Sequence, residues 1–282
     1  TKEAGEFIEG KTTWEAEGPC ISELSHAGML LGKKSIHHQY AHCWRCKNPV
    51  IYRATEQWFA SINDFREKAL EAVDNTTFIP SWGHDRLYNM VRDRQDWCIS
   101  RQRSWGVPIP AFYCDDCGKY VITPETIGKV KSVVEKEGSD AWWSYPAEKL
   151  LPENFKCPHC GGTHFHKETD IMDVWFDSGS TWNGVLKDPH ENWKKDGAEY
   201  PCDLYLEGSD QHRGWFQSSL LTSVAVNGKA PYKAVLTHGF TMDGEGRKMS
   251  KSVGNVVAPQ DIIDKYGADV MRLWISSVDY QG

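Results

Sequence analysis

The spacing of hydrophobic residues predicts helices in the first part of the chain. In residues 1–42, short amphipathic pieces alternate with glycine-containing turns, and we expect one short helix that ends near Gly28 or Gly32. Apolar side chains then recur at helical spacing through Arg53–Val73 and again through His84–Cys98. That spacing is typical of amphipathic helices whose apolar stripe faces a core.

From Thr169 the pattern changes to short apolar runs that alternate with amphipathic segments. We expect strands at Ile171–Phe176, Asp203–Glu207 and Lys233–Thr241, and helices at Trp215–Val226 and Pro259–Tyr266. Strands that alternate with helices in this way favour a parallel sheet in a doubly wound α/β domain.

Polar, glycine-rich stretches follow the predicted strands. They are Asp177–Gly179, Gly208–Gly214 and Met242–Ser252. Ligands bind at the carboxyl ends of the strands in an open α/β sheet. We therefore expect these three stretches to converge on one binding site.

The composition is that of a globular protein. The chain has 282 residues, enough for two modest domains, and 40% of them are hydrophobic. A net charge of −7 argues against bulk electrostatic binding of nucleic acid, although a local basic face is compatible with it. The sequence has neither an apolar run of membrane-spanning length nor a signal-peptide pattern at its beginning. We expect a soluble, cytoplasmic protein without membrane contact.

Six of the nine cysteines form C-x-x-C pairs: Cys43/Cys46, Cys114/Cys117 and Cys157/Cys160. An odd total without a signal sequence favours metal binding in a reducing compartment over disulfides. The second and third pairs bracket a compositional island, Tyr113–Phe165, with a helix expected from Pro124 to Glu137. Four thiolates from two tight turns suit tetrahedral Zn²⁺, which predicts a zinc ribbon. His159 and His164 are substitute ligands, and redox dithiols are the alternative.

A lysine-containing loop spans Gly246–Asn255. Lys248 and Lys251 flank Met249 and Ser250, with glycines on either side. Two ammonium groups on such a loop can neutralise charge that develops on a polyphosphate during phosphoryl or nucleotidyl transfer. The alternative is an ordinary solvated turn. The expected convergence of the strand ends favours the phosphate-binding interpretation.

Five motifs together resemble the class I aminoacyl-tRNA synthetases, and within that class the isoleucyl family of the bacterial type. They are His42–Cys46, Asp96–Pro110, Asp173–Gly179, Glu207–Phe216 and Lys248–Ser252. The resemblance spans almost the whole chain. The run Glu-Gly-Ser-Asp-Gln-His-Arg-Gly-Trp-Phe is the part that indicates isoleucine, and the valyl family is the alternative within the class.

The resemblance implies a role for each matching residue. Positions that hold the aminoacyl-adenylate are matched by Glu207, Gly208, Asp210 and Gln211. Walls of the isoleucine side-chain pocket are matched by Trp175 and Trp215, and nucleotide contacts by His238 and Phe240. Lys251 matches the lysine on the ATP phosphates, with Lys248 as its catalytic partner.

The reaction that the resemblance implies is ATP-dependent ligation of isoleucine to tRNA(Ile). The isoleucine carboxylate attacks the α-phosphate of ATP, Mg²⁺-bound pyrophosphate leaves, and the terminal ribose of the tRNA accepts the aminoacyl group. Positioning and charge stabilisation supply most of this chemistry. The implied cofactors are Zn²⁺ and Mg²⁺ with ATP, and the whole enzyme is expected to be a monomer.

One motif of the class, His-x-Gly-His, does not occur in this sequence. The chain is therefore expected to be the C-terminal half of a Rossmann-like doubly wound parallel sheet with a zinc-ribbon insertion, inactive by itself. Cys43 and Cys46 are expected to form a half site that stays vacant or recruits His37 or His42. The alternative from another class of function is a zinc-ribbon module that binds RNA without chemistry.

The resemblance also predicts a division into five parts. Residues 1–45 are the tail of an editing insertion, and residues 46–110 are a helical part of the catalytic domain. The zinc ribbon is expected at 111–166, and the second half of the Rossmann domain at 167–247. Residues 248–282 would carry the lysine loop and the start of a stem-contact region.

Overall fold

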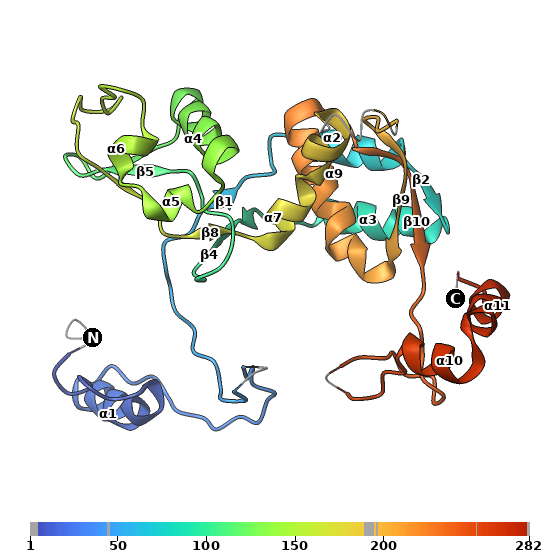
Figure 1. Ribbon diagram of the computed structural model, residues 1–282. Helices are drawn as coiled ribbons and strands as arrows, with labels where there is room; N and C mark the ends of the chain where they lie inside the picture. Colours follow the sequence, from blue (N-terminus) through green and yellow to red (C-terminus); the bar gives the residue numbers. More distant parts are fainter. Residues whose placement is uncertain (1–4, 44–45, 189–194, 196, 252, 281–282) are drawn as a thin grey trace. The chain divides into compact units, whose positions relative to one another are not determined.

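The computed structural model describes residues 5–43, 46–188, 195, 197–251 and 253–280. The chain divides into two compact units, Thr1–Glu56 and Gln57–Gly282 (Figure 1). The first unit contains α1 (Thr13–His26), which begins at a capping box between Thr12 and Glu15. The helix ends just before Gly28, whose φ of 68° ends the helical path, as the sequence predicts.

A parallel sheet lies at the centre of the second unit. Its strands are β2 (Thr77–Ile79), β9 (Cys202–Gly208) and β10 (Tyr232–His238), in the order β2-β10-β9. Both neighbours of β10 run parallel to it. This confirms the predicted α/β class with a parallel sheet. The strand β2 is a third member of this sheet that the predicted strands do not include.

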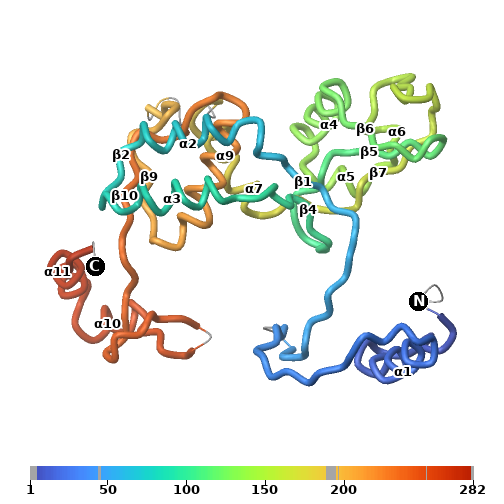
Figure 2. Tube along the Cα trace, turned by 180° about the vertical axis from the view of Figure 1, so that it is seen from behind, coloured from blue at the N-terminus to red at the C-terminus, as the bar shows by residue number. Residues whose placement is uncertain are grey.

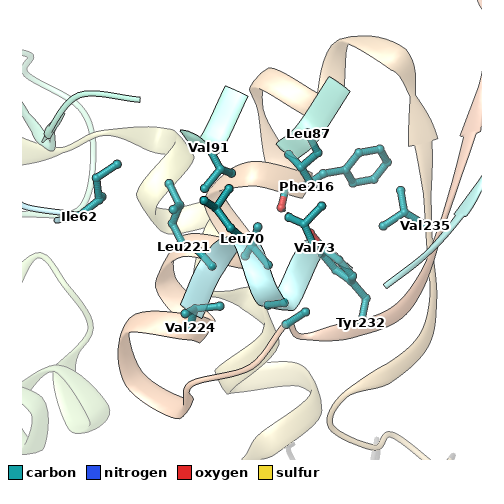
Figure 3. Packing of buried hydrophobic residues seen from close by; sticks show 14 of the residues in the cluster. Ile62, Leu70, Val73, Leu87, Val91, Phe216, Leu221, Val224, Tyr232 and Val235 are labelled. Carbon is teal, nitrogen blue, oxygen red and sulfur yellow. Dashed lines mark hydrogen bonds between the residues drawn. The ribbon is translucent and has the colours of Figure 1, made fainter. Parts of the chain in front are cut away.

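Three helices, α2 (Arg66–Asp74), α3 (Trp82–Arg92) and α9 (Trp215–Asn227), cover one face of this sheet (Figures 1 and 2). The buried side chains between them belong to one cluster, part of which is drawn in Figure 3: Leu70, Val73, Leu87, Val91, Phe216, Leu221, Val224, Tyr232 and Val235. Side chains alternate between the two faces of a strand. Tyr205 of β9 is accordingly buried in this core, whereas its neighbours Leu204 and Leu206 are 44% and 51% exposed.

The predicted helix over Arg53–Val73 is wrong in its first half. The helix α2 begins only at Arg66, and Phe59–Ala60 forms the strand β1 instead. Tertiary contacts explain the difference. The backbone N–H of Trp58 donates to Ser100 Oγ, and its indole N–H donates to the buried Glu168, with N···O distances of 2.9 and 2.7 Å. These bonds hold the segment extended despite its helical spacing.

The predicted helix over His84–Cys98 is also too long. The helix α3 ends at Arg92, and β3 (Trp97–Cys98) pairs antiparallel with β1. The next strand, β4 (Ser100–Arg101), pairs with β8 (Ile171–Met172). Burial of Trp97 and pairing with distant strands outweigh the local helical pattern.

The predicted strand Ile171–Phe176 is wrong beyond Met172. After β8 the chain turns into the short helix α7 (Val174–Gly179). Asp173 caps this helix, because its carboxylate accepts the N–H of Trp175 at 3.3 Å. The buried Asp173 carboxylate also accepts the indole N–H of Trp97 and pairs with Arg101, each at 3.0 Å. An apolar run that looks like a strand is therefore broken by one capping aspartate.

The cysteine-containing insertion has its own sheet and core. The sheet has the order β6-β5-β7, formed by Tyr120–Val121, Phe112–Cys114 and Phe165–Lys167. The helix α4 (Pro124–Glu137) matches its predicted bounds, and two short helices follow, α5 (Ala141–Ser144) and α6 (Ala147–Leu150). Phe112, Trp142 and Leu150 are fully buried there, in a cluster separate from that of the parallel sheet.

The remaining elements lead to and from the parallel sheet. A π-helical turn (Asn183–Lys187) follows α7, and the 3₁₀ turn η3 (Ser209–Arg213) follows β9. Beyond β10 and the lysine loop come α10 (Pro259–Tyr266), with its predicted bounds, and α11 (Ala268–Ser277).

Candidate functional site

The carboxyl edge of the parallel sheet gathers the polar residues that the sequence singles out there. Glu207 and Gly208 end β9, and Gly208 pairs with His238 at the end of β10. A Cβ atom on Gly208 would lie 2.9 Å from Asp210 Oδ1 and 3.3 Å from the Phe240 ring. Gly208, Asp210, His238 and Phe240 are therefore immediate neighbours, and only glycine leaves the backbone open at this point.

A pocket of about 590 Å³ lies beside this edge. Glu207 and Gln211 line it together with the indoles of Trp175 and Trp215. The Trp215 ring stacks on Tyr205 with centroids 4.0 Å apart, and its indole N–H donates to the Ser178 carbonyl at 3.0 Å. Flat, fixed indoles with a carboxylate and an amide nearby suit an apolar ligand that carries one polar end.

Gln211 lines the pocket and is bound to the start of α9. Its Oε1 accepts the backbone N–H of Trp215 at 2.9 Å, which satisfies a free donor at the start of α9. A Cβ atom on Gly214 would lie 2.6 Å from Gln211 Oε1 and 2.9 Å from the Trp175 ring. Trp175 and Gln211 are thus packed around a position where a side chain would collide.

His212 is a residue of the site region that the sequence does not single out. It is fully buried, and its Nδ1 lies 3.0 Å from the Ser209 carbonyl oxygen. Burial lowers the pKa of His212, so the ring is neutral and Nδ1 donates to that carbonyl. The ring fixes the turn that presents Asp210 and Gln211. A histidine in a polar run carries no hydrophobic signal that would predict its burial.

The lysine loop begins as a tight hairpin. Met242 bridges to Lys248 in antiparallel fashion, and the N–H of Met249 donates to the Thr241 carbonyl at 3.2 Å. Lys248 Nζ lies over the Phe240 ring, 3.4 Å from its centroid, as a cation–π contact. Phe240 therefore connects the loop to the edge at Gly208. Ser252 lies outside the described residues.

Not every predicted site residue lies at the edge. Lys251 is exposed, has no ion pair among the described residues and does not line the 590 Å³ pocket. Within the same loop, the Asn255 amide, followed by the N–H of Arg247, holds the pKa of the Asp243 carboxyl down at about 2. Glu207, Gly208, Asp210 and Phe240 thus lie together at the sheet edge, whereas Lys251 is not among the residues that line its pocket.

A second pocket, of about 770 Å³, opens on the other side of α7. Arg101, Arg103, Trp105 and Trp143 are among its lining residues, together with Asp177. Burial, and secondarily the charge of Asp173, raises the pKa of Asp177 to about 6. Trp105 is 91% exposed, which is unusual for so large an apolar side chain.

The four cysteines of the insertion form one cluster. The sulfur atoms of Cys114, Cys117, Cys157 and Cys160 all lie within 4.8 Å of one another. The Cys114–Cys160 and Cys117–Cys157 sulfur distances are 3.6 and 3.8 Å. Tetrahedral Zn²⁺ with bonds of about 2.3 Å requires sulfur atoms ~3.8 Å apart. The residues present therefore fit a structural zinc ion.

The same backbone hydrogen bond follows the first cysteine of each C-x-x-C pair. In each, the N–H four residues after the first cysteine donates to that cysteine's carbonyl at 2.8 Å, with donors at Lys47, Gly118 and Gly161. These donor residues all have positive φ, between 63° and 79°. Glycine adopts that conformation without strain, whereas Lys47 adopts it at a cost. Among the described residues, Cys43 and Cys46 belong to no group of three or more metal-binding side chains.

Comparison with known proteins assigns the chain to the class of tRNA synthetases that its motifs resemble. The chain belongs to the family of class I tRNA synthetases (I, L, M and V), whose family model matches residues 9–282. It is 61% identical over 280 residues to the isoleucine–tRNA ligase of Caldicellulosiruptor bescii. It is 60% identical over 281 residues to that of Carboxydothermus hydrogenoformans.

The chain spans only part of these relatives. The matches cover 99% and 100% of the chain but 30% of each relative. Among solved structures, Mycobacterium tuberculosis methionyl-tRNA synthetase bound by methionyl-adenylate shares the fold, with a TM-score of 0.50 and 20% identity over 84% of this chain and 36% of that one. Every helix among the described residues is too short or too polar to cross a lipid bilayer.

Proposed function

We propose that the protein to which this chain belongs ligates isoleucine to tRNA(Ile) through an isoleucyl-adenylate. The observation that carries the proposal is the cluster at the sheet edge, where Glu207, Asp210 and Gln211 adjoin a pocket walled by two tryptophans. The two relatives named isoleucine–tRNA ligase support the choice of amino acid.

The pocket suits the amino acid half of the adenylate. Trp175 and Trp215 offer flat apolar walls to an aliphatic side chain, and the fixed Trp215 ring limits its size. Glu207 and Asp210 offer carboxylates to the substrate ammonium group or to ribose hydroxyls. Gly208 admits the ligand close to the backbone. Such a pocket separates isoleucine from valine by only ~1–3 kcal/mol, so the whole enzyme needs an editing step.

We assign the nucleotide half of the adenylate to the part of the sheet edge that lies beside the lysine loop. His238 and Phe240 would contact the base and ribose, and Lys251 would bind the phosphates of Mg²⁺-bound ATP with Lys248 as its partner. The cation–π contact between Lys248 and the Phe240 ring supports this grouping of the lysine loop with the nucleotide side. Charge neutralisation by the two lysines would stabilise the pentavalent α-phosphate as pyrophosphate leaves.

The zinc ion is assigned a structural role. Bound by Cys114, Cys117, Cys157 and Cys160, it would hold the two halves of the insertion together, and residues 111–166 would form the zinc ribbon. Cys43 and Cys46 are proposed as a half site, which is supported by the hydrogen bond from the Lys47 N–H to the Cys43 carbonyl, a bond that the other two pairs also have.

The test is isoleucine-dependent ATP–pyrophosphate exchange by a full-length enzyme that contains this sequence. We expect Lys251→Ala to lower the exchange rate about 100-fold, because it removes a charge aimed at the transition state. The matched control is Lys131→Ala, which removes a lysine of α4 that is 68% exposed. Equal rates for the two variants would contradict the assignment, and a preference for valine would favour the valyl family.

A second candidate function, RNA binding without chemistry, is favoured by the 770 Å³ pocket. Arg101 and Arg103 with the exposed Trp105 combine cationic groups and a stacking surface, as sites for single-stranded RNA do. A mobility-shift assay with tRNA and the exchange assay, both run on a full-length protein that contains this sequence, together separate the two functions. Tight binding of tRNA by a full-length protein that shows no exchange activity would favour the RNA-binding module.

A further inference from the structure

Asp243 and Asn255 close the lysine loop at its base. Residues 243–247 form the first turn, in which the N–H of Asp243 donates to the Arg247 carbonyl at 2.8 Å. A second turn follows, in which the N–H of Gly254 donates to the Ser250 carbonyl at 3.1 Å. The second turn brings Asn255 back beside Asp243, and the Asn255 amide donates to Asp243 Oδ2 at 2.8 Å.

Each oxygen of the Asp243 carboxylate accepts two hydrogen bonds. Its Oδ1 accepts the backbone N–H groups of Glu245 and Arg247 at 3.0 and 2.8 Å. Its Oδ2 accepts Arg247 Nε at 2.9 Å in addition to the Asn255 amide. Only 10% of the side chain is exposed, although the loop around it lies at the surface. Both oxygens face donors, so a neutral amide of the same shape would place an N–H against an N–H.

Asn255 holds the segment that carries the lysines. Its Oδ1 accepts the N–H of Ser250 at 2.9 Å, and its amide nitrogen also contacts the Lys248 carbonyl at 3.3 Å. The backbone is therefore fixed on both sides of Met249, whose sulfur accepts the N–H of Val257 at 3.3 Å. Lys248 and Lys251 leave the chain at the two ends of this fixed segment.

We propose that Asp243 and Asn255 are positioning residues for adenylate formation, which hold Lys248 and Lys251 in one fixed relation so that both reach the phosphates together. The inference rests on the proposed function of the two lysines. Neither residue touches substrate in this account; each acts through the lysine backbone. A displacement of a charged group by about 1 Å can lower a rate by ~100-fold, so a loose loop costs rate even with both lysines intact.

The test uses a full-length enzyme that contains this sequence and two variants, Asp243→Asn and Asn255→Ala. We expect kcat for isoleucine-dependent exchange to fall about 10–100-fold in each. KM for isoleucine should stay within about twofold, because the amino acid pocket lies at α7 and α9. The matched control is Glu245→Gln in the same turn, whose carboxylate is 72% exposed and pairs with Arg247. It should behave as wild type.

A double-mutant cycle separates positioning from general loss of structure. If Asp243 acts through Lys251, Asp243→Asn should slow a Lys251→Ala enzyme by less than about threefold. Hydrogen exchange provides a readout besides activity: the amides of Arg247 and Ser250 should exchange at least about tenfold faster in Asp243→Asn than in Glu245→Gln.

The outcomes separate the two proposals. The positioning role would be overturned if the double variant lost exchange rate by the product of the two single-variant factors. It would also be overturned if KM for isoleucine rose by as large a factor as kcat fell in Asp243→Asn. Wild-type kinetics for Asp243→Asn beside an impaired Lys251→Ala enzyme would overturn this inference alone. A Lys251→Ala enzyme with wild-type exchange would overturn the proposed function of the loop and the inference with it.

Discussion

The cysteine cluster and the sheet edge are built in different ways. All four thiols come from two short turns, and their sulfur spacing already suits a tetrahedral ion. The sheet edge collects residues from β9, β10, η3 and α7, and its most important proposed charge, Lys251, stands clear of the pocket. The motif His-x-Gly-His does not occur in the sequence at all. The first site is self-contained, whereas the second depends on tertiary assembly.

The largest effect is expected from removing one cysteine turn. Changing Cys157 and Cys160 together to alanine should abolish zinc binding, since structural zinc supplies on the order of 10 kcal/mol to folding. Elemental analysis should fall from about one equivalent to none, and the insertion should become sensitive to protease. The same change at Cys43 and Cys46 is the control and should leave that equivalent in place. Loss of zinc in the control instead would show that the cluster is not self-contained.

A smaller effect is expected at the contact between α7 and α9. A Cβ atom on Gly179 would lie 2.8 Å from the Ser218 backbone, so Gly179→Ala should destabilise the second unit by ~1–3 kcal/mol. The urea midpoint should fall while the zinc content stays unchanged. Gly184→Ala provides the control, because nothing lies within 4 Å of the added atom. Equal midpoints for the two variants would show that the pocket does not depend on this close packing.

The smallest effect concerns pH. Hydrogen bonds to Asp85 and then Asp74 raise the pKa of His84 above its usual value. The folded protein therefore binds this proton more tightly than the unfolded chain does. The contribution to stability is fully present below about pH 6.5 and is lost as the pH rises through the raised pKa. His84→Gln should lower the free energy of unfolding at pH 5.5 by less than about 1 kcal/mol, and by much less at pH 8.5. The urea midpoint at each pH measures this change. A constant difference across this range would contradict the assignment.

The same contrast explains how far the sequence predicts the structure. Turn chemistry is local, so α4 and α10 match their predicted bounds from their initial prolines. The strands β9 and β10 are predicted because their apolar runs are flanked by turn residues. The helix expected from Arg53 fails since Trp58 bonds to Ser100 and Glu168, partners far along the chain.

Site residues follow the same rule. Glu207, Asp210 and Gln211 are predicted because they match positions of the family motif Glu207–Phe216. Burial of His212 and the Asp243–Asn255 hydrogen bond depend on how the loops fold back, which no spacing reveals. The strand expected through Phe176 fails because Asp173 both caps α7 and binds Arg101. One polar residue with several tertiary partners decides that local structure.

Isoleucine-dependent ATP–pyrophosphate exchange by the chain alone, loaded with one equivalent of zinc, tests the central contrast most directly. The account predicts no exchange above background, because the sheet edge and the lysine loop form only part of the adenylate site. A full-length enzyme that contains this sequence should exchange rapidly under the same conditions. Robust exchange by the chain alone would contradict the account and would show that its residues make a complete active site.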